Sequence, residues 1–341
     1  MGLKVAVLGA GVMGHALALV HALGGCRVRL TDTQPGPLAR AGALMSAALA
    51  TLREAGETEH GDAWLASAVT THAALAETLE GAELVVEAIT EDAESKRALF
   101  AEVDRLAPPG AIIASNTSYL DPFPLIPKAR QSRAAIAHWY TPPYIVDLVD
   151  IVAGPECDPA VPHRLRDLYA AMGKRPVVMR RFVPGFIANR IQAVVSMEVF
   201  ALLDDGVADA AEIDTAIVHG LALRMPLLGH LMKADFTGLR LTQKALANAM
   251  VPPPQQRLRS RALDSLVAAG ATGVEAGRGF YDYGGRSPAA LFAERDRKLL
   301  ALKRAHRQPR AMTLTGTAAL RPRAPLGSGL RRSSDFRPPA P

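Results

Sequence analysis

Three glycines near the amino terminus have the spacing of a loop that binds the pyrophosphate of a dinucleotide. They form a G-x-G-x-x-G run that directly follows the apolar segment Lys4–Leu8. In this pattern the first glycine permits a tight turn, the second lets the backbone approach the pyrophosphate, and the third allows a helix to pack closely on its strand. The helix that follows offers unpaired N–H groups to the anion. The residues predicted to hold the dinucleotide are Gly9, Gly11, Val12, Met13 and Gly14.

Asp32 indicates which dinucleotide is bound. It ends the next apolar segment, Arg27–Thr31, where a carboxylate accepts hydrogen bonds from the ribose hydroxyls of NAD. The same carboxylate would repel the 2′-phosphate of NADP, and the following residues, Thr33 to Pro35, include no arginine to bind that phosphate. The expected cofactor is therefore NAD. FAD is a less favoured alternative cofactor, which stays open because flavoproteins share the glycine loop.

Polar side chains gather where three further apolar segments end. These are Glu87 to Lys96, Ser115 to Ser118, and His138. Ligands of an open α/β sheet bind at the carboxyl ends of its strands, so these residues are expected to surround one site. Hydride transfer from an alcohol needs a base, and histidine suits this role near neutral pH. Either Asp147 or Asp150 lies within range to orient the imidazole of His138.

The other histidines are interpreted as structural. The chain has nine histidines, and none of the remaining ones forms a pair with metal-ligand spacing and a nearby carboxylate. No metal site is therefore expected.

The elements that would position these residues alternate between strands and helices, which favours a doubly wound parallel sheet. From Pro184 to about residue 270 the pattern is helical, without a convincing strand. We expect an α/β fold with a Rossmann-type NAD-binding domain (1–182), an all-helical domain for substrate binding and dimerisation (183–302), and a disordered, basic, proline-rich tail (303–341). The predicted strands are Lys4–Leu8, Arg27–Thr31, Leu84–Ile89, Ala111–Ala114, Ala134–His138, Leu148–Val152 and Pro176–Met179, and the predicted helices of the first domain are Val12–Leu23, Ala39–Ala55, Ser95–Leu106 and Pro159–Met172.

The basic charge of the chain comes from its last residues. The 341 residues carry a formal net charge of +6, but residues 303–341 hold nine basic residues and one acid, so the rest is mildly acidic. Binding to nucleic acid is therefore not expected. Membrane association is not expected either, because no apolar run approaches the ~18 residues that span a bilayer. Two cysteines, Cys26 and Cys157, provide no disulfide framework and fit a cytoplasmic location.

Several motifs carry a family resemblance. They are GAGVMG, VVEAITE followed by Lys96, ASNTS, HWYTPP, GKRPVVM, PGFIANR and GRGFYDY. In this order, over residues 3–303, they resemble the NAD-dependent L-3-hydroxyacyl-CoA dehydrogenases and their 3-hydroxy-acid relatives. The resemblance implies oxidation of a 3-hydroxy compound by hydride transfer to NAD, and a homodimer that pairs through the C-terminal domain. A CoA thioester substrate would imply a place in fatty acid metabolism.

The resemblance also implies catalytic roles. His138 is the expected general base, Ser118 bonds the 3-oxygen of the substrate, and Asn189 helps complete the site. The acidic partner of the histidine is Asp150, where the family usually has glutamate. Without the resemblance, Asn189 would be interpreted as a polar residue at a helix amino terminus.

For the cofactor, the resemblance implies that Glu91 and Lys96 contact NAD, and Asn116 of the ASNTS motif is expected to do the same. Without the resemblance, Lys96 would be interpreted as a solvent-facing side chain. Two further residues depart from the family pattern: Thr141 replaces the usual asparagine of H-x-x-N-P, and Glu275 replaces a lysine that the family has near the cofactor. These departures motivate an alternative, an NAD(H)-binding structural or sensing dimer with little catalysis.

The substrate class stays open between a CoA thioester and a free hydroxy acid. Residues 38–80 contain two arginines, no lysine and six acids, which is a poor cradle for the phosphate of CoA. The HWYTPPYIV segment resembles the sequences of the branch that oxidises small free hydroxy acids, the gulonate dehydrogenase type. Arg190, Arg224 and Lys233 are candidates to meet a substrate carboxylate.

Overall fold

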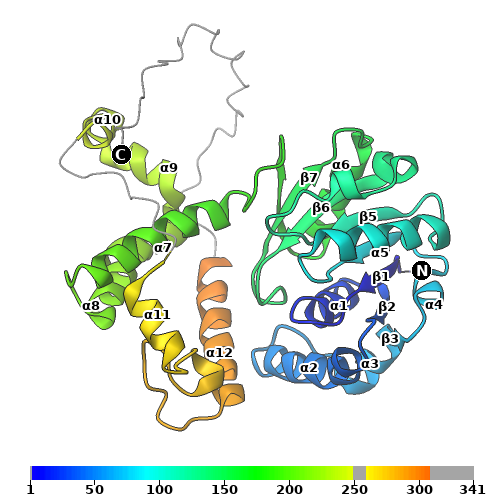
Figure 1. Ribbon diagram of the computed structural model, residues 1–341, viewed down its shortest axis with the longest axis horizontal. Helices are drawn as coiled ribbons and strands as arrows, with labels where there is room; N and C mark the ends of the chain where they lie inside the picture. The colour runs from blue at the N-terminus through cyan, green and yellow to red at the C-terminus, as the bar shows by residue number, and fades with distance from the viewer. Residues whose placement is uncertain (1, 249–258, 308–341) are drawn as a thin grey trace, which may run out of the picture.

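The computed structural model describes residues 2–248 and 259–307. A sheet with helices on both faces forms the first part of the chain, and a group of helices forms the second (Figure 1). Residues 180–187 connect the last strand to the first helix of the second part. Both parts match the expected fold class, a Rossmann-type sheet followed by an all-helical region.

The sheet has eight strands in the order β3-β2-β1-β4-β5-β6-β7-β8. All neighbours are parallel except β6 and β7, which are antiparallel. All seven predicted strands are present within a few residues of the expected bounds, and β3 was missed. Three of its four residues are polar and it lies at the sheet edge, so it has no apolar signal. The strands are β1 (Lys4–Leu8), β2 (Arg27–Thr31), β3 (Val69–His72), β4 (Leu84–Glu87), β5 (Ile112–Ser115), β6 (Ala134–Trp139), β7 (Leu148–Ala153) and β8 (Arg175–Met179).

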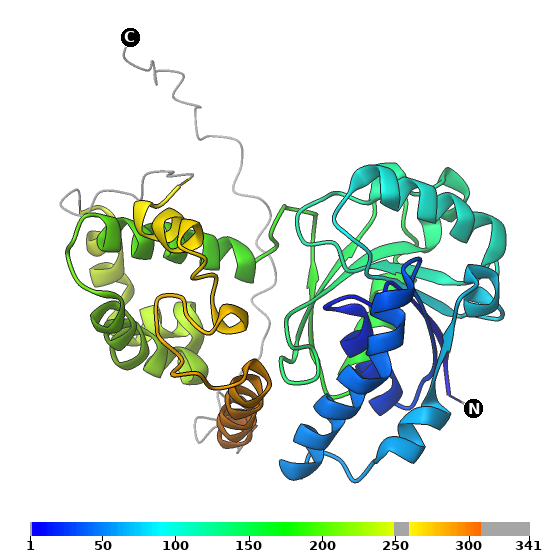
Figure 2. The same ribbon diagram turned by 60° about the horizontal axis from the view of Figure 1, so that its bottom comes forward.

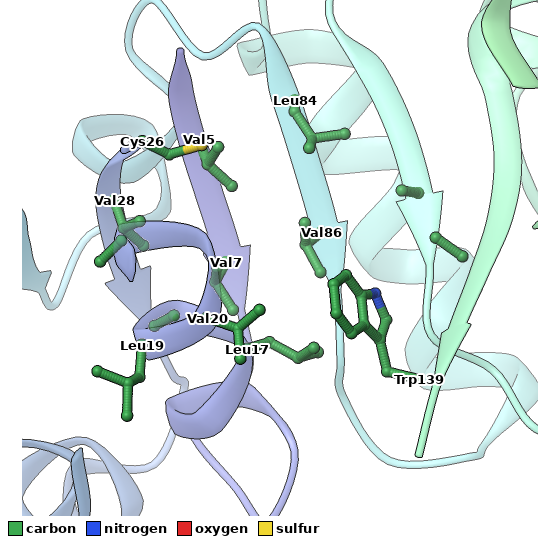
Figure 3. Close-up of a cluster of buried hydrophobic side chains, with 14 of the residues drawn as sticks. Val5, Val7, Leu17, Leu19, Val20, Cys26, Val28, Leu84, Val86 and Trp139 are labelled. Carbon is green, nitrogen blue, oxygen red and sulfur yellow. The ribbon is translucent and has the colours of Figure 1, made fainter. Parts of the chain in front are cut away.

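Alternate residues of β1 point to opposite faces of the sheet, as the pleat of a strand requires. Val5 and Val7 join the core under α1 and α6, whereas Ala6 and Leu8 join the core under α4 and α5. Figure 3 shows the first of these cores, with Trp139 reaching into it from β6. The helices of this part are α1 (Gly14–Leu23), α2 (Pro35–Glu54), α3 (Asp62–Ala68), α4 (Leu75–Leu79), α5 (Ala93–Leu106) and α6 (Ala160–Ala171).

The described residues of the second part form helices joined by loops and contain no strand, apart from isolated bridges that join Arg278 to Gly273 and Asp282. One segment, Ala216–Leu221, is a π-helix. No helix within residues 2–248 and 259–307 is long and apolar enough to cross a membrane. The α-helices are α7 (Ala188–Asp204), α8 (Ala210–Thr215), α9 (Met225–Thr237), α10 (Leu239–Leu246), α11 (Arg261–Ala268) and α12 (Pro288–Arg307).

Helix α12 packs against the first part of the chain, beside α2 (Figure 2). Leu300 of α12 is buried in a small core with Leu52 and Ile145. The Nζ of Lys303 donates to the carbonyl of Ile145 at 2.7 Å and to Oδ1 of Asp147 at 2.5 Å. The helix therefore extends five residues into the expected tail, and the remainder of that tail, 308–341, lies outside the described residues.

His21 of α1 is a fully buried histidine. Its Nδ1 lies 2.8 Å from the carbonyl oxygen of Leu17, and its ring centroid lies 5.6 Å from that of Trp139. Burial lowers the pKa of His21 to about 4. The unfolded chain therefore binds one more proton than the native state between about pH 4 and pH 6.5. The neutral ring stabilises the fold fully above pH 6.5, and this contribution is lost as the pH falls toward 4.

We expect His21→Gln to reduce the pH dependence of stability. In the wild type this residue alone lowers the free energy of unfolding by about 1.4 kcal/mol per pH unit in that range. Urea denaturation at pH 7.0 and pH 5.0 measures the difference for wild type and variant. His163→Gln, at an exposed position of α6, is the control and should leave the pH dependence unchanged. If the free energy of unfolding fell equally between pH 7.0 and pH 5.0 in wild type and in His21→Gln, the low pKa of the buried imidazole would be contradicted.

Candidate active site

The glycine loop follows β1 and opens α1, as expected. Gly9 has a φ of 102°, and a Cβ there would lie 2.6 Å from the carbonyl oxygen of Ala88. A Cβ on Gly14 would lie 1.7 Å from the carbonyl oxygen of Gly9, so helix and strand pack too closely for any side chain. A Cβ on Gly11, in contrast, would meet no atom within 4 Å. Only this glycine leaves open space, which is where a pyrophosphate would approach the backbone.

Asp32 lies beside this loop. Its Oδ2 accepts from the backbone N–H of Ala10 at 2.7 Å, and its Oδ1 accepts from that of Gln34 at 2.8 Å. These bonds fix the carboxylate at the end of β2 and leave lone pairs for ribose hydroxyls. Val12 is exposed at the tip of the loop, and the Sδ of Met13 accepts a hydrogen bond from the Thr141 hydroxyl. The residues present therefore fit a dinucleotide.

We expect Gly11→Ala to weaken NAD binding without destabilising the fold. The added methyl group has room in the protein but occupies the space facing the pyrophosphate, so the Kd of NADH should rise roughly tenfold or more. Fluorescence titration with NADH and the melting temperature give the two readouts. Gly42→Ala on α2 is a matched control, since its Cβ also meets nothing within 4 Å. Unchanged NADH affinity in Gly11→Ala would place the cofactor elsewhere.

Ser118, His138 and Asp150 come together at the carboxyl end of β6. His138 and Asp150 are direct partners in the antiparallel β6–β7 pair, so their side chains share one face of the sheet. Ser118 Oγ lies 3.3 Å from His138 Nε2. On the other side of the ring, His138 Nδ1 lies 3.6 Å from Asp150 Oδ2, which is a close ion-pair distance and too long for a hydrogen bond. Asp150, rather than Asp147, is therefore the carboxylate that faces the imidazole.

Both His138 and Asp150 are buried. Within the described residues, His138 Nδ1 and Asp150 Oδ1 have no hydrogen-bond partner. Buried polar groups are rarely left so, and such groups indicate a functional role or a partner that arrives with substrate. The arrangement can take a proton at Nε2 while a carboxylate lies behind the ring.

Phe186 covers the imidazole and was missed by the sequence reasoning. Its ring stacks on that of His138 with centroids 4.5 Å apart, and it is fully buried. It is also the one non-glycine residue within the described chain with a positive φ, at 52°. Such a strained backbone persists only where surrounding contacts hold it. The only signal for Phe186 in the sequence is its place in the PGFIANR motif.

Asn189 begins α7, next to the segment that carries Ser118. The backbone N–H of Gly185 donates to the carbonyl of Ser118 at 3.0 Å, and a Cβ on Gly185 would lie 3.6 Å from the Cβ of Asn189 and 3.4 Å from the Cγ of Arg190. The turn at Gly185 thus brings the start of the helical part to the serine.

Glu91 holds the loop that carries Ser118. One oxygen, Oε1, accepts from the Thr117 hydroxyl at 2.7 Å and from the backbone N–H groups of Ser118, Tyr119 and Leu120 at 2.8 to 2.9 Å. Burial raises the pKa of Glu91, but these donors and Lys96 outweigh it, so the pKa of the carboxyl lies below its usual value. Glu91 stays ionised and fixes the loop.

Lys96 is buried, not solvent-facing. Its Nζ donates to Glu87 Oε1 at 2.6 Å and lies 3.7 Å from Glu91 Oε2, while the Ser115 hydroxyl donates to the other oxygen of Glu87. This cluster joins the ends of β4 and β5 to α5. Asn116 follows, and its Oδ1 accepts from the backbone N–H of Trp139 at 2.9 Å. These residues support the site from behind, and their expected contacts with NAD remain a prediction.

A cavity of about 1040 Å³ adjoins the glycine loop. Its walls are the loop from Ala10 to Val12, the exposed side of α2, residues 141–144 and the first half of α12. Glu275, which departs from the family pattern, lies in this wall. Within residues 2–248 and 259–307, no group of three or more His, Cys, Asp or Glu side chains could hold a metal ion.

Two family matches cover most of the chain. Residues 4–182 match the NAD binding domain of 3-hydroxyacyl-CoA dehydrogenase, and residues 185–283 match its C-terminal domain. The chain belongs to the 3-hydroxyacyl-CoA dehydrogenase family. It is an NAD-dependent oxidoreductase, and the reaction of the family is the oxidation of 3-hydroxy compounds. The expected cofactor, NAD, is confirmed.

Similar proteins of this family include enzymes named for small substrates. A 5-formyl-3-hydroxy-2-methylpyridine 4-carboxylate 5-dehydrogenase of Mesorhizobium japonicum is 29% identical over 88% of this chain and 97% of its own. An L-carnitine dehydrogenase of Nocardiopsis dassonvillei is 34% identical over 88% of this chain and 91% of its own. The crystal structure of 5-formyl-3-hydroxy-2-methylpyridine 4-carboxylic acid 5-dehydrogenase, an NAD+-dependent dismutase, is similar with a TM-score of 0.80 at 27% identity, covering 90% of this chain and 99% of that one.

Proposed function

We propose that this dehydrogenase oxidises a small free 3-hydroxy acid to the 3-oxo acid, with His138 as the general base. The observation that carries the reaction is the array at the end of β6, in which a buried imidazole lies between a hydroxyl and a carboxylate. The array stands at the same sheet edge as the glycine loop. An alcohol bound there would meet both a proton acceptor and a hydride acceptor.

Each residue of the array has a distinct task in this proposal. NAD, when bound, accepts the hydride from the carbon that carries the hydroxyl. The hydroxyl proton passes to His138 Nε2, and the Ser118 hydroxyl, 3.3 Å from that nitrogen, holds the substrate oxygen. The Asp150 carboxylate stabilises the imidazolium that forms, because charge–charge attraction is strong in a buried site. Asn189 completes the site from α7.

The surface around α2 supports a free acid over a CoA thioester. Glu54, the last residue of α2, and Glu57 in the turn that follows face α12, where Arg297 and Arg304 lie 3.8 Å and 3.1 Å from them. The helix therefore covers part of α2, and residues 38–80 contain no lysine for a CoA phosphate. The match to the C-terminal domain of the family ends at residue 283, before α12 begins. The names of the two relatives above, which describe carnitine and a pyridine carboxylate, agree with a small substrate.

A substrate panel tests the proposal. NAD reduction is followed at pH 8 with L-carnitine, L-gulonate, 3-hydroxybutyrate and 3-hydroxybutyryl-CoA. We expect kcat/KM for at least one free acid to exceed that for the thioester by about 100-fold, which corresponds to roughly 2.7 kcal/mol of transition-state binding. Preference for the thioester would overturn the substrate class and place the enzyme in fatty acid metabolism. No turnover with tight NADH binding would favour a binding or sensing protein.

The proposal includes a homodimer formed through the helical part. Helices α9 and α10 expose large apolar side chains to an extent that is unusual for a solvated surface. The exposed apolar residues of α9 and α10 include Leu227, Leu231, Phe236, Leu239, Leu241 and Leu246.

The proposal also includes a cytoplasmic location. Two free thiols, Cys26 and Cys157, agree with it.

A further inference from the structure

Tyr140 contacts both members of the His138–Asp150 pair. Its hydroxyl donates to Asp150 Oδ2 at 2.6 Å, and this is the same oxygen that lies 3.6 Å from His138 Nδ1. Its ring meets the imidazole edge-on, with centroids 4.6 Å apart and an interplanar angle of 78°. Residues 138 and 140 have the same parity, so both side chains leave the chain on one side. The tyrosine therefore restrains the carboxylate and the ring together.

The same hydroxyl lies at the amino end of α7. Burial and Asp150 raise the pKa of Tyr140, and the nearby backbone N–H groups of Ala188 and Asn189 lower it. These amides belong to the first turn of α7, where helix N–H groups lack partners within the helix. The Tyr140 hydroxyl, bonded to Asp150 of the sheet, is therefore close to the start of the helix that carries Asn189.

Without this hydroxyl, the Asp150 carboxylate would have no hydrogen-bond donor within the described residues. Its Oδ1 already lacks a partner, and the imidazole is too distant to donate. Asp150 is almost fully buried, and a buried carboxylate without donors is strongly disfavoured. The aspartate is one methylene shorter than glutamate, so it falls short of the imidazole, and the tyrosine is the group that fixes it there.

We propose that Tyr140 is a positioning residue that holds the Asp150 carboxylate opposite His138. The inference rests on the proposed function, in which His138 is the base. It follows that Tyr140 and Asp150 act as one unit. A glutamate at position 150 would reach the imidazole directly and would then need no tyrosine.

A double-mutant cycle tests this coupling. We expect Tyr140→Phe to lower kcat about tenfold, the size typical of removing a partner that orients a catalytic group, with KM for NAD unchanged. Asp150→Glu alone should also lower kcat, because the longer side chain and the hydroxyl compete for the same space. The double variant Y140F/D150E should recover to within about threefold of wild type. Tyr281→Phe is the matched control: it removes another tyrosine–aspartate bond of 2.6 Å, to Asp214, in the helical part.

A readout independent of turnover separates this inference from the proposed function. Nitrogen-15 NMR of histidine-labelled protein with NADH bound reports which imidazole nitrogen carries the proton, and the His138 signal is identified by its absence in His138→Ala. We expect the Nδ1–H form to predominate in wild type and in the double variant, and a mixture of forms in Tyr140→Phe.

Two results would overturn the inference. One is a Tyr140→Phe variant whose kcat and histidine spectrum both match the wild type. The other is a double variant in which the fold decrease in kcat equals the product of the fold decreases in the two single variants. If no substrate is turned over, the proposed function fails and the spectra alone decide whether Tyr140 orients the pair. Tyr140→Phe melting within a few degrees of Tyr281→Phe excludes loss of the fold as the cause.

Discussion

Replacing His138 by alanine is expected to lower kcat about a thousandfold while leaving the Kd of NADH within twofold of wild type. The imidazole Nε2 is the proton acceptor nearest to the Ser118 hydroxyl, and the carboxylate behind the ring has no path to the substrate except through it. The glycine loop and Asp32, which are predicted to hold the cofactor, are not among the residues that contact the ring. Catalysis and cofactor binding should therefore separate in this variant.

The alanine variant also removes a ring that stacks on Phe186, so its stability has to be measured alongside its rate. His138→Gln is the second variant, because its side chain fills more of the space and retains a hydrogen-bonding amide. We expect kcat to fall in both variants. The melting temperature of the glutamine variant should lie closer to that of the wild type than the melting temperature of the alanine variant does. Turnover within tenfold of wild type in either variant would remove His138 from the role of base.

Replacing Lys96 by methionine is expected to destabilise the fold by about 3 to 5 kcal/mol. The Lys96 ammonium is 1% exposed and the Glu87 carboxylate 0% exposed, so removing the cation leaves a buried charge without its partner. The Ser115 hydroxyl and the backbone N–H of Ile89 still donate to Glu87, but two neutral hydrogen bonds do not replace an ion pair at 2.6 Å. Such a loss is a large part of the stability of a typical domain.

Two comparisons sharpen this test in urea denaturation. The double variant E87Q/K96M removes both charges and should recover more than half of the loss, since the destabilisation comes from the unpaired charge. Lys298→Met removes a lysine–glutamate contact of similar length, 2.7 Å, on the exposed side of α12, and should cost less than about 0.5 kcal/mol. Equal losses in Lys96→Met and Lys298→Met would show that burial of the pair has no energetic consequence.

The sequence predicts the inner strands well because β1, β4, β5 and β6 are buried on both faces and appear as continuous apolar runs. The edge strand β3 lacks that signal. Without the family resemblance, the residue type of Lys96 alone indicates a solvent-facing side chain, yet Lys96 lies four residues before Phe100 and seven before Val103, on the buried stripe of α5. That spacing was available in the sequence and indicates a buried position.

The candidate site was predictable in part. The strand ends bring Ser118 and His138 to one edge, and the family resemblance assigns their roles. The contact of Phe186 with His138 was not predictable, because it depends on how the turn at Gly185 places the start of α7 against the sheet. The bond from Tyr140 to Asp150 was not predictable either, because it depends on the register of β6 and β7. Phe186 lies 48 residues after His138 in the chain, and local patterns carry no information on such a contact.

Helix α12 gives the helical part a second attachment to the first part of the chain. Residues 180–187 form one connection, and the contacts of Leu300 and Lys303 form the other (Figure 1). A body tethered at one point turns about three axes, whereas a body tethered at two points turns about the single line that joins them. Any movement of the helical part relative to the sheet is thereby restricted to rotation about one axis.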